Sequence, residues 1–297
     1  MYYFMLCCAT ALFSLQYVFN KAYQKNMGET LTSSCLFSMG SALVFGVILF
    51  VYNGCALRFS WFSALLALAN AIVCVLCGYC SIVSLSIADL SKYTLYLMLG
   101  GMAIPFAYGF AFNGDTFTWQ KIVCFVLVAI ALVGNSMDGA GAKKTERKGK
   151  WCYAGIFVLN GMTGVIATMH QMPAQGMTNV PTNDFIIWCN IMQIVVSAAV
   201  LCFVRSRGGA VSLPEGKNAL RTVLLAVVGY GVVHGVATVL DFISLLHIEP
   251  TVQFPIITGG CVVLGVVFGL FFKEKITKRK ALWALVTLAG TLVLVIP

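Results

Sequence analysis

The segment LMLGGMAIPFAYGFAFNGDTFTWQK, residues 97–121, has a related segment 159 positions later in the chain, IITGGCVVLGVVFGLFFKEKITKRK at residues 256–280. The shift aligns two glycines, an acidic residue and a threonine, namely Gly100 with Gly259, Gly101 with Gly260, Asp115 with Glu274, and Thr118 with Thr277. Chance rarely preserves four such matches in one register. We therefore predict two related halves, 1–141 and 151–297, joined by a basic linker at 142–150.

Composition identifies the class of protein. The chain is 60% apolar and only 10% charged, whereas a typical soluble domain is roughly 45–50% apolar and about 25% charged. Its net charge of +9 sits at the ends of apolar runs, and no basic face with interleaved aromatics is present. These features predict a membrane protein and argue against nucleic acid as a partner.

Charged residues divide the chain into ten charge-free spans, which we number in order: 1–20, 30–57, 59–88, 93–114, 122–137, 151–183, 185–204, 222–240, 250–272 and 281–297. About 20 apolar residues cross a ~30 Å hydrocarbon core as a helix, which satisfies its own backbone hydrogen bonds. We therefore predict an all-α membrane protein with ten transmembrane helices. Because each half has five spans, the second half enters the membrane in the opposite orientation, as two inverted five-helix repeats do.

Lys and Arg concentrate in the odd-numbered connections between spans. These connections hold 17 of the 19 basic residues, and the even-numbered connections hold only Arg58 and Lys121. Short cytoplasmic loops carry such an excess and face an anionic lipid leaflet. The pattern predicts odd connections in the cytoplasm and both termini outside a bacterial plasma membrane. The first 20 residues lack the basic region of a signal peptide, so we expect them to form a span.

A polar turn of the form G-[ED]-x-[LF]-T-x-x-[QK] follows the fourth and ninth spans, and the next span has a late glycine. The pattern is carried by Gly114, Asp115, Thr118 and Gln120 in the first half and by Glu274, Thr277 and Gly290 in the second, with Lys273 in place of the second-half glycine. In these motifs and in span count the chain resembles the EamA-like branch of the drug/metabolite transporter superfamily. The resemblance implies a cavity lined by spans 1–4 and 6–9, with spans 5 and 10 peripheral and available for a homodimer contact.

Polar residues deep in a span are functional candidates because they are costly in lipid. In the eighth span Tyr230, His234, Thr238 and Asp241 follow one another at i, i+4, i+8 and i+11, which places them on one helix face. His234 lies near mid-span, and a histidine with an unperturbed pKa of ~6.5 exchanges protons at physiological pH. We predict that His234 and Asp241 couple transport to protons.

Helical spacing in the other spans adds to a polar lining. The predicted substrate-binding residues are Gln16, Asn20, Tyr93, Tyr96, Asn160, Thr163, His170, Asn190, Gln193, His234, Thr238 and Gln253. Each also has a simpler interpretation, because a single Asn or Gln in a membrane helix often only joins two helices, at ~0.6 kcal/mol. The tyrosines are equally typical of the membrane–water interface.

The twelve cysteines do not indicate a metal or redox site. Cys74, Cys77 and Cys80 share one helix face, but no fourth ligand is near in sequence, and a free cysteine in an apolar span packs as a small hydrophobe. We expect no metal or other cofactor.

The expected function is secondary transport of a small polar or amphipathic metabolite or drug. No P-loop of the form GxxxxGK[ST] occurs, which argues against energy from ATP in this chain. A lipid-carrier flippase of the same fold is an alternative. An intramembrane enzyme is another, although His234 and Asp241 would be its only acid–base pair, and we expect no enzyme.

Overall fold

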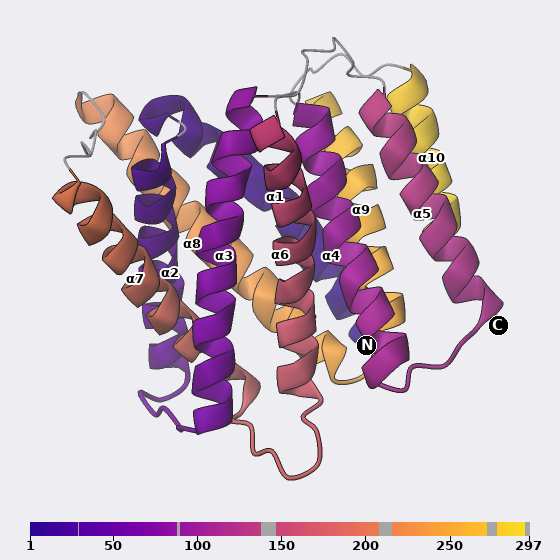
Figure 1. Ribbon diagram of the computed structural model, residues 1–297, viewed down its shortest axis with the longest axis horizontal. Helices are drawn as coiled ribbons and strands as arrows, with labels where there is room; N and C mark the ends of the chain where they lie inside the picture. Colours follow the sequence, from indigo (N-terminus) through magenta and orange to yellow (C-terminus); the bar gives the residue numbers. More distant parts are fainter. Residues whose placement is uncertain (29, 88–89, 138–146, 208–215, 272–277, 295–297) are drawn as a thin grey trace.

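The computed structural model describes residues 1–28, 30–87, 90–137, 147–207, 216–271 and 278–294 (Figure 1). Within these ranges the chain forms ten helices and no strand, which confirms the predicted all-α class. The helices are α1 (Tyr2–Met27), α2 (Leu31–Tyr52), α3 (Trp61–Ile87), α4 (Leu90–Phe112), α5 (Trp119–Met137), α6 (Arg147–Gln171), α7 (Thr182–Ser206), α8 (Lys217–Leu245), α9 (Pro250–Phe271) and α10 (Lys278–Val293).

Six helices contain described segments long and apolar enough to cross a membrane: Tyr2–Met27, Leu31–Tyr52, Trp61–Ser81, Trp151–Gln171, Thr182–Ser206 and Lys217–Leu245. The described apolar segments of the other four helices are shorter: Tyr96–Phe112, Trp119–Gly134, Pro250–Leu264 and Ala281–Val293. The chain is therefore an integral membrane protein by the length and composition of its helices. Ten complete spans remain a prediction.

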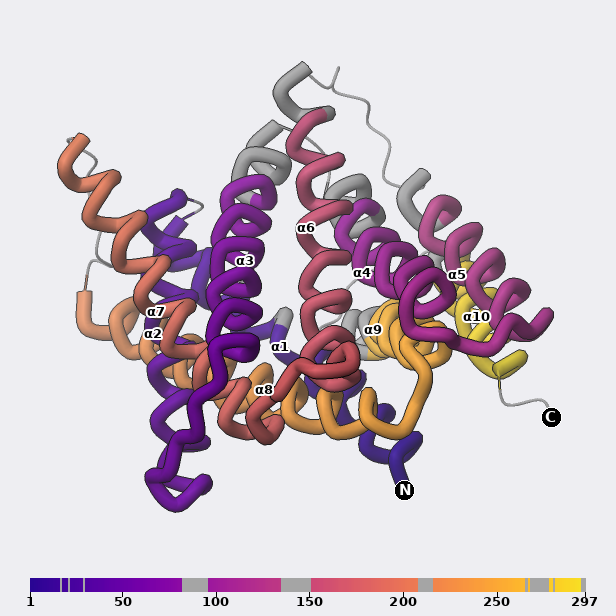
Figure 2. Tube along the Cα trace, turned by 60° about the horizontal axis from the view of Figure 1, so that its bottom comes forward, coloured from indigo at the N-terminus to yellow at the C-terminus, as the bar shows by residue number. Residues whose placement is uncertain are grey.

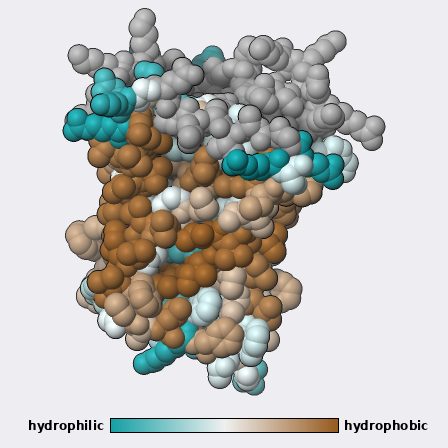
Figure 3. All heavy atoms as spheres, turned by 90° about the vertical axis from the view of Figure 1, so that its left-hand side faces the viewer, coloured by the Kyte–Doolittle hydropathy of each residue, from teal (hydrophilic) through white to brown (hydrophobic). Residues whose placement is uncertain are grey.

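The outer surface fits a lipid environment. Large apolar side chains are exposed along the helices, for example Leu43, Val47 and Val51 on α2 and Leu224 and Leu225 on α8. Figure 3 shows a broad apolar band across one face of the molecule, with hydrophilic residues near its two ends. An exposed apolar surface of this extent is unusual for a soluble monomer but suits contact with hydrocarbon.

Successive helices run in opposite directions (Figure 1). The turns 53–60, 113–118, 172–181 and 246–249 gather at the end drawn at the bottom of Figure 1, which we call the lower end. The opposite, upper end includes the end of α1 at Met27 and the beginning of α2 at Leu31. Basic residues in the described odd connections therefore lie at the upper end.

The two halves are interleaved. Across them α1 packs on α8, α6 on α3, α2 on α7, α4 on α9, and α5 on α10. Helices α5 and α10 lie together at one edge of the bundle (Figures 1 and 2). Small residues permit the closest approaches: a Cβ on Gly161 of α6 would lie 2.6 Å from the carbonyl oxygen of Gly100 on α4. Such glycines are typical of membrane helix contacts.

Candidate functional site: a cavity between the halves

A cavity of about 600 Å³ lies among the helices. Its described lining residues come from α1–α4 and α6–α9, whereas α5 and α10 supply none of them. This division agrees with the arrangement that the family resemblance implied. The volume is within the range of small-molecule sites, roughly 300–1,000 Å³.

The cavity extends from the upper end to a closed floor. Its lining includes Gly28 and Thr30, between α1 and α2 at the upper end. At the other extreme it reaches Phe242 and Phe254, which pack with Ala167 about one turn above the lower ends of α8, α9 and α6. None of the four lower turns contributes a lining residue. The described lining therefore extends from the upper end of the bundle to this floor and does not reach the four lower turns.

His234 occupies the middle of the cavity wall. Its Nδ1 lies 2.6 Å from Oε1 of Gln16 on α1, so the tautomer with hydrogen on Nδ1 donates to this amide oxygen. The ring of Tyr230 stacks on His234 at a centroid distance of 5.1 Å, and Phe13 lies 5.8 Å away. Nε2 of His234 has no hydrogen-bond partner in the described part of the chain. The imidazole is thus held to α1 through Nδ1 and stacked on Tyr230.

Asp241 lies near the floor, two turns beyond His234 on α8. Nε2 of Gln253 donates to its Oδ1 at 2.6 Å and to its backbone carbonyl at 2.9 Å. Gln253 is fully buried behind the wall, and its Oε1 lacks a partner among the described residues. The buried amide therefore fixes the orientation of a carboxylate that faces the cavity.

Uncharged amides and hydroxyls form most of the remaining polar wall. Gln193 on α7 donates to Ser38 on α2 at 2.5 Å. Asn160 on α6 donates to the carbonyl of Leu97 on α4 at 2.7 Å. Both bonds cross between the halves, which satisfies polar groups that would be costly without partners. The predicted lining residues that reach this wall are Gln16, Asn20, Asn160, Thr163, Asn190, Gln193, His234, Thr238 and Asp241.

Two predicted substrate contacts, Tyr96 and His170, are not among the residues that line the cavity. Tyr96 is 38% exposed and stacks on Tyr153 at 4.9 Å. His170 lies in the last turn of α6, below the floor, where it is fully buried, contacts Ser63 at 3.1 Å and stacks on Phe185 at 3.6 Å. The helical stripe that contains Asn160 and Thr163 continues past the end of the cavity.

Gln253 also differs from its predicted role, because it supports Asp241 and does not line the cavity. The side chain of Tyr93 lies outside the described residues.

Sequence reasoning missed part of the wall. Asn70 on α3 lines the cavity, as do Ser34, Ser38 and Ser41 on α2. The serines recur at i, i+4 and i+7, a spacing that places them on one helix face and could have identified them. A lone Asn70 between apolar residues offered no comparable signal.

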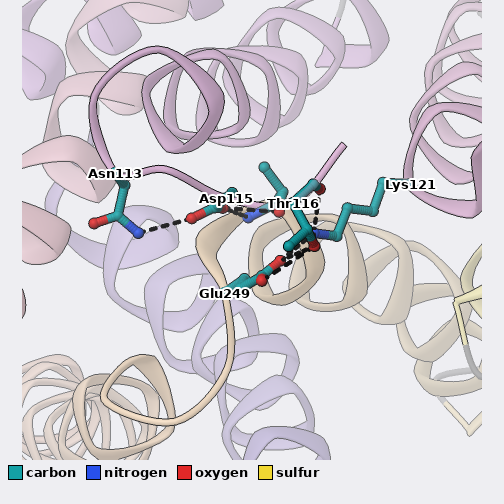
Figure 4. A network of polar contacts seen from close by, with 6 residues as sticks. Asn113, Asp115, Thr116, Lys121 and Glu249 are labelled. Carbon is teal, nitrogen blue, oxygen red and sulfur yellow. Dashed lines mark hydrogen bonds and ion pairs between the residues drawn. The ribbon is translucent and has the colours of Figure 1, made fainter. Parts of the chain in front are cut away.

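Two polar contacts join the halves at the lower end. In the first, Asp115 in the turn before α5 accepts bonds from the backbone N–H of Thr251 at 3.1 Å and from its hydroxyl at 2.8 Å (Figure 4). Asn113 donates to the other carboxylate oxygen at 2.7 Å. Beside them Lys121 forms an ion pair with Glu249, which precedes α9. We call this group the α9 latch.

The second contact, the α7 latch, joins the turn after α2 to the first turn of α7. Asn53 donates to Oδ1 of Asp184 at 2.5 Å, and the backbone N–H of Arg58 donates to Oδ2 at 3.2 Å. Asp184 is almost fully buried. In each latch an aspartate joins an interhelix turn of the first half to the beginning of a helix in the second.

A solved structure described as "Crystal structure of protein" shares this fold: the TM-score is 0.74 at 14% sequence identity, over 98% of this chain and 95% of that chain. It is among 28 chains of solved structures that match. No protein-family model matches the sequence, and no curated protein matches it. The likeness to the solved structure establishes the fold alone.

Proposed function

We propose that this chain is a secondary active transporter that moves a small polar or amphipathic metabolite by alternating access. The observation that carries the proposal is the cavity, which reaches the upper end and ends at a floor above two polar contacts between the halves. Rocking one half against the other would separate both latches and open the lower end. The cavity volume of about 600 Å³ suits a metabolite.

Ten spans in two inverted five-helix repeats form part of this proposal. In such a repeat, each helix of the first half corresponds to the helix five places later, and equivalent helix pairs should pack alike. The pair α1–α8 corresponds to α6–α3, and the pair α4–α6 corresponds to α9–α1. All four pairs are in contact. Corresponding glycines support the same relationship. Gly101 on α4 faces Asn160 of α6, and Gly260 on α9 faces Thr10 of α1.

Charge supports an orientation with the upper end in the cytoplasm of a bacterial cell. Exposed basic residues occur at the upper ends of α7, α8 and α10: Arg205, Arg207, Lys217, Arg221, Lys278 and Arg279. Arg58 and Lys121 belong to the lower end. The cavity would then face the cytoplasm, and the EamA-like resemblance makes export or proton-coupled exchange through His234 and Asp241 our preferred mode.

Side-specific cysteine labelling tests alternating access without knowledge of the substrate. Three variants each retain one of the twelve native cysteines. Cys74 lines the cavity, Cys55 is exposed in a lower turn, and Cys124 is fully buried in a packed cluster. Each variant is treated with a membrane-impermeant maleimide in vesicles of either orientation.

We expect Cys55 to react only from the lower side and Cys124 from neither side. Cys74 should react quickly from the upper side and slowly but measurably from the lower side. Reaction of Cys74 from the lower side no faster than that of Cys124 would contradict alternating access. Lipid scrambling measured in the same vesicles separates a flippase from a carrier of soluble compounds.

A further inference from the structure

The charge inside the cavity is opposite in sign to that of the whole chain. The protein carries a net charge of +9, yet no Lys or Arg occurs among the described lining residues. Asp241 is the one carboxylate in that lining, and His234 is the one histidine. With a neutral imidazole, an ionised Asp241 would give the described wall a single negative charge.

Asp241 lies at the floor of the cavity, beside Phe242 and Phe254. One carboxylate oxygen is occupied by Gln253 at 2.6 Å, whereas Oδ2 has no hydrogen-bond partner among the described residues. An ionised carboxylate away from bulk water is unfavourable unless it is paired. Among the described residues, Oδ2 of Asp241 is therefore available to accept a hydrogen bond from a ligand.

The surroundings of Asp241 suit a cation with an apolar body. Phe242 and Phe254 form the floor beside it, packed with Ala167. Aromatic faces attract ammonium groups, and more strongly in a desolvated site. Above the floor, the amides and hydroxyls of the wall offer neutral contacts, with no described positive side chain that would repel a cation or attract an anion.

We propose that the cavity is selective for protonated organic amines, with Oδ2 of Asp241 accepting from the ammonium group and the Phe242–Phe254 floor contacting the apolar body. This inference rests on the proposed transport function and specifies its substrate class. Gln253 is the positioning residue that holds the carboxylate toward the cavity. A carboxylate- or phosphate-bearing substrate would meet the unpaired negative charge and is excluded.

A matched series of small probes tests this selectivity on the full-length chain in detergent. The ammonium ion of 3,3-dimethylbutylamine, the alcohol 3,3-dimethylbutan-1-ol and the anion 3,3-dimethylbutanoate share one branched apolar body and differ in charge. Equilibrium dialysis at pH 7 gives the affinity for each probe. We expect the ammonium ion to bind at least about tenfold tighter than the alcohol, as a charge-assisted hydrogen bond would give, and the carboxylate to bind weakest.

The variant Asp241→Asn should remove the difference between ammonium and alcohol, and Asp241→Glu should retain it in part. The control Thr222→Ala, at the upper end of α8 and outside the cavity lining, should keep the full preference. Equal binding of the ammonium and the alcohol by the parent chain, or binding of no probe, overturns the proposal, and this holds even if Asp241→Asn does not fold. A preference that survives in folded Asp241→Asn also overturns it.

The two proposals fail separately. If Cys74 is labelled from both sides but no probe series shows a preference for the amine, the transport proposal stands and the substrate class is wrong. One-sided labelling with a clear preference for the amine would leave a cation-binding site without alternating access.

Discussion

Asp115 accepts two hydrogen bonds from Thr251, one from its backbone N–H at 3.1 Å and one from its hydroxyl at 2.8 Å (Figure 4). Thr251 lies in the first turn of α9, where backbone N–H groups have no partner within the helix. An N-terminal cap usually comes from the residue that precedes the helix. Here it comes from a turn in the other half of the chain, so one carboxylate both caps α9 and joins the two halves at the lower end.

Replacement of Asp115 by alanine should destabilise the protein. The substitution leaves the buried N–H and hydroxyl of Thr251 without an acceptor. This should lower the free energy of unfolding by about 1–3 kcal/mol. We expect a lower midpoint of thermal unfolding in detergent. The variant Thr251→Val removes the hydroxyl alone, and the double variant should cost less than the sum of the two. Strictly additive losses would show that the two residues do not interact.

Weakening either latch should favour the state that is open at the lower end. Asn53→Ala removes a donor to Asp184, and Lys121→Ala removes the ion pair with Glu249. Each loss of about 1.4 kcal/mol changes a two-state population about tenfold. In the chain that retains Cys74 alone, maleimide labelling from the lower side should accelerate by about that factor in each variant.

The matched control for the latch variants is Thr222→Ala at the upper end, where the threonine hydroxyl donates to the carbonyl of Asn218 on its own helix and has no other partner among the described residues. Labelling of Cys74 from the lower side should be unchanged in this control. Equal rates in the latch variants and in the control would mean that the latches do not hold the lower end closed.

The helical class could be predicted from sequence because lipid leaves few options. Charge-free spans satisfy their backbone only as helices, and alternating helices follow from short connections. The positions of charged residues predicted the ends of the helices less accurately than their number and class. Arg221 and Asp241 bounded the predicted eighth span, but α8 begins at Lys217 and ends at Leu245. A carboxylate that faces a cavity can lie within a membrane helix, and Asp241 is on the cavity wall and not at a helix end.

The candidate site was only partly predictable because spacing identifies a helix face but not its neighbour. The stripe from Tyr230 to Asp241 lines the cavity as one surface. On α6 the predicted lining included His170, which lies beyond the cavity, because the sequence does not show where the cavity ends. Asn53 and Asp184 are 131 residues apart, and no pattern in either segment indicates their contact.

Replacement of His234 by glutamine should flatten the pH dependence of alternating access. The glutamine side chain keeps the polarity and approximate size of the site but cannot take up a proton near neutral pH, whereas an imidazole can. The ratio of the labelling rates of Cys74 from the lower and the upper side, measured between pH 5.5 and 8.5, gives this dependence, because ionisation of the thiol itself affects both rates equally. A Gln16→Leu variant should alter the curve without removing it, because it deletes the partner of Nδ1 and not the titrating ring. An unchanged curve in His234→Gln would exclude the ring as the proton site.

Two helical glycines, Gly100 on α4 and Gly78 on α3, should differ in their tolerance of alanine according to what they face. A Cβ on Gly100 would overlap the backbone of Phe157 on α6, which cannot move without shifting the helix. A Cβ on Gly78 would meet only the Ser34 hydroxyl at 3.3 Å, and this side chain can rotate away. Overpacking against fixed atoms costs typically about 1–3 kcal/mol, whereas alanine in place of an unobstructed helical glycine gains up to about 1 kcal/mol.

We therefore expect Gly100→Ala to lower the thermal midpoint and the yield of folded protein, and Gly78→Ala to leave both unchanged or improved. Since both positions are helical glycines, the change in helix propensity is the same and cancels in the comparison. Equal stability of the two variants would mean that α4 and α6 do not approach as closely as Gly100 and Phe157 indicate.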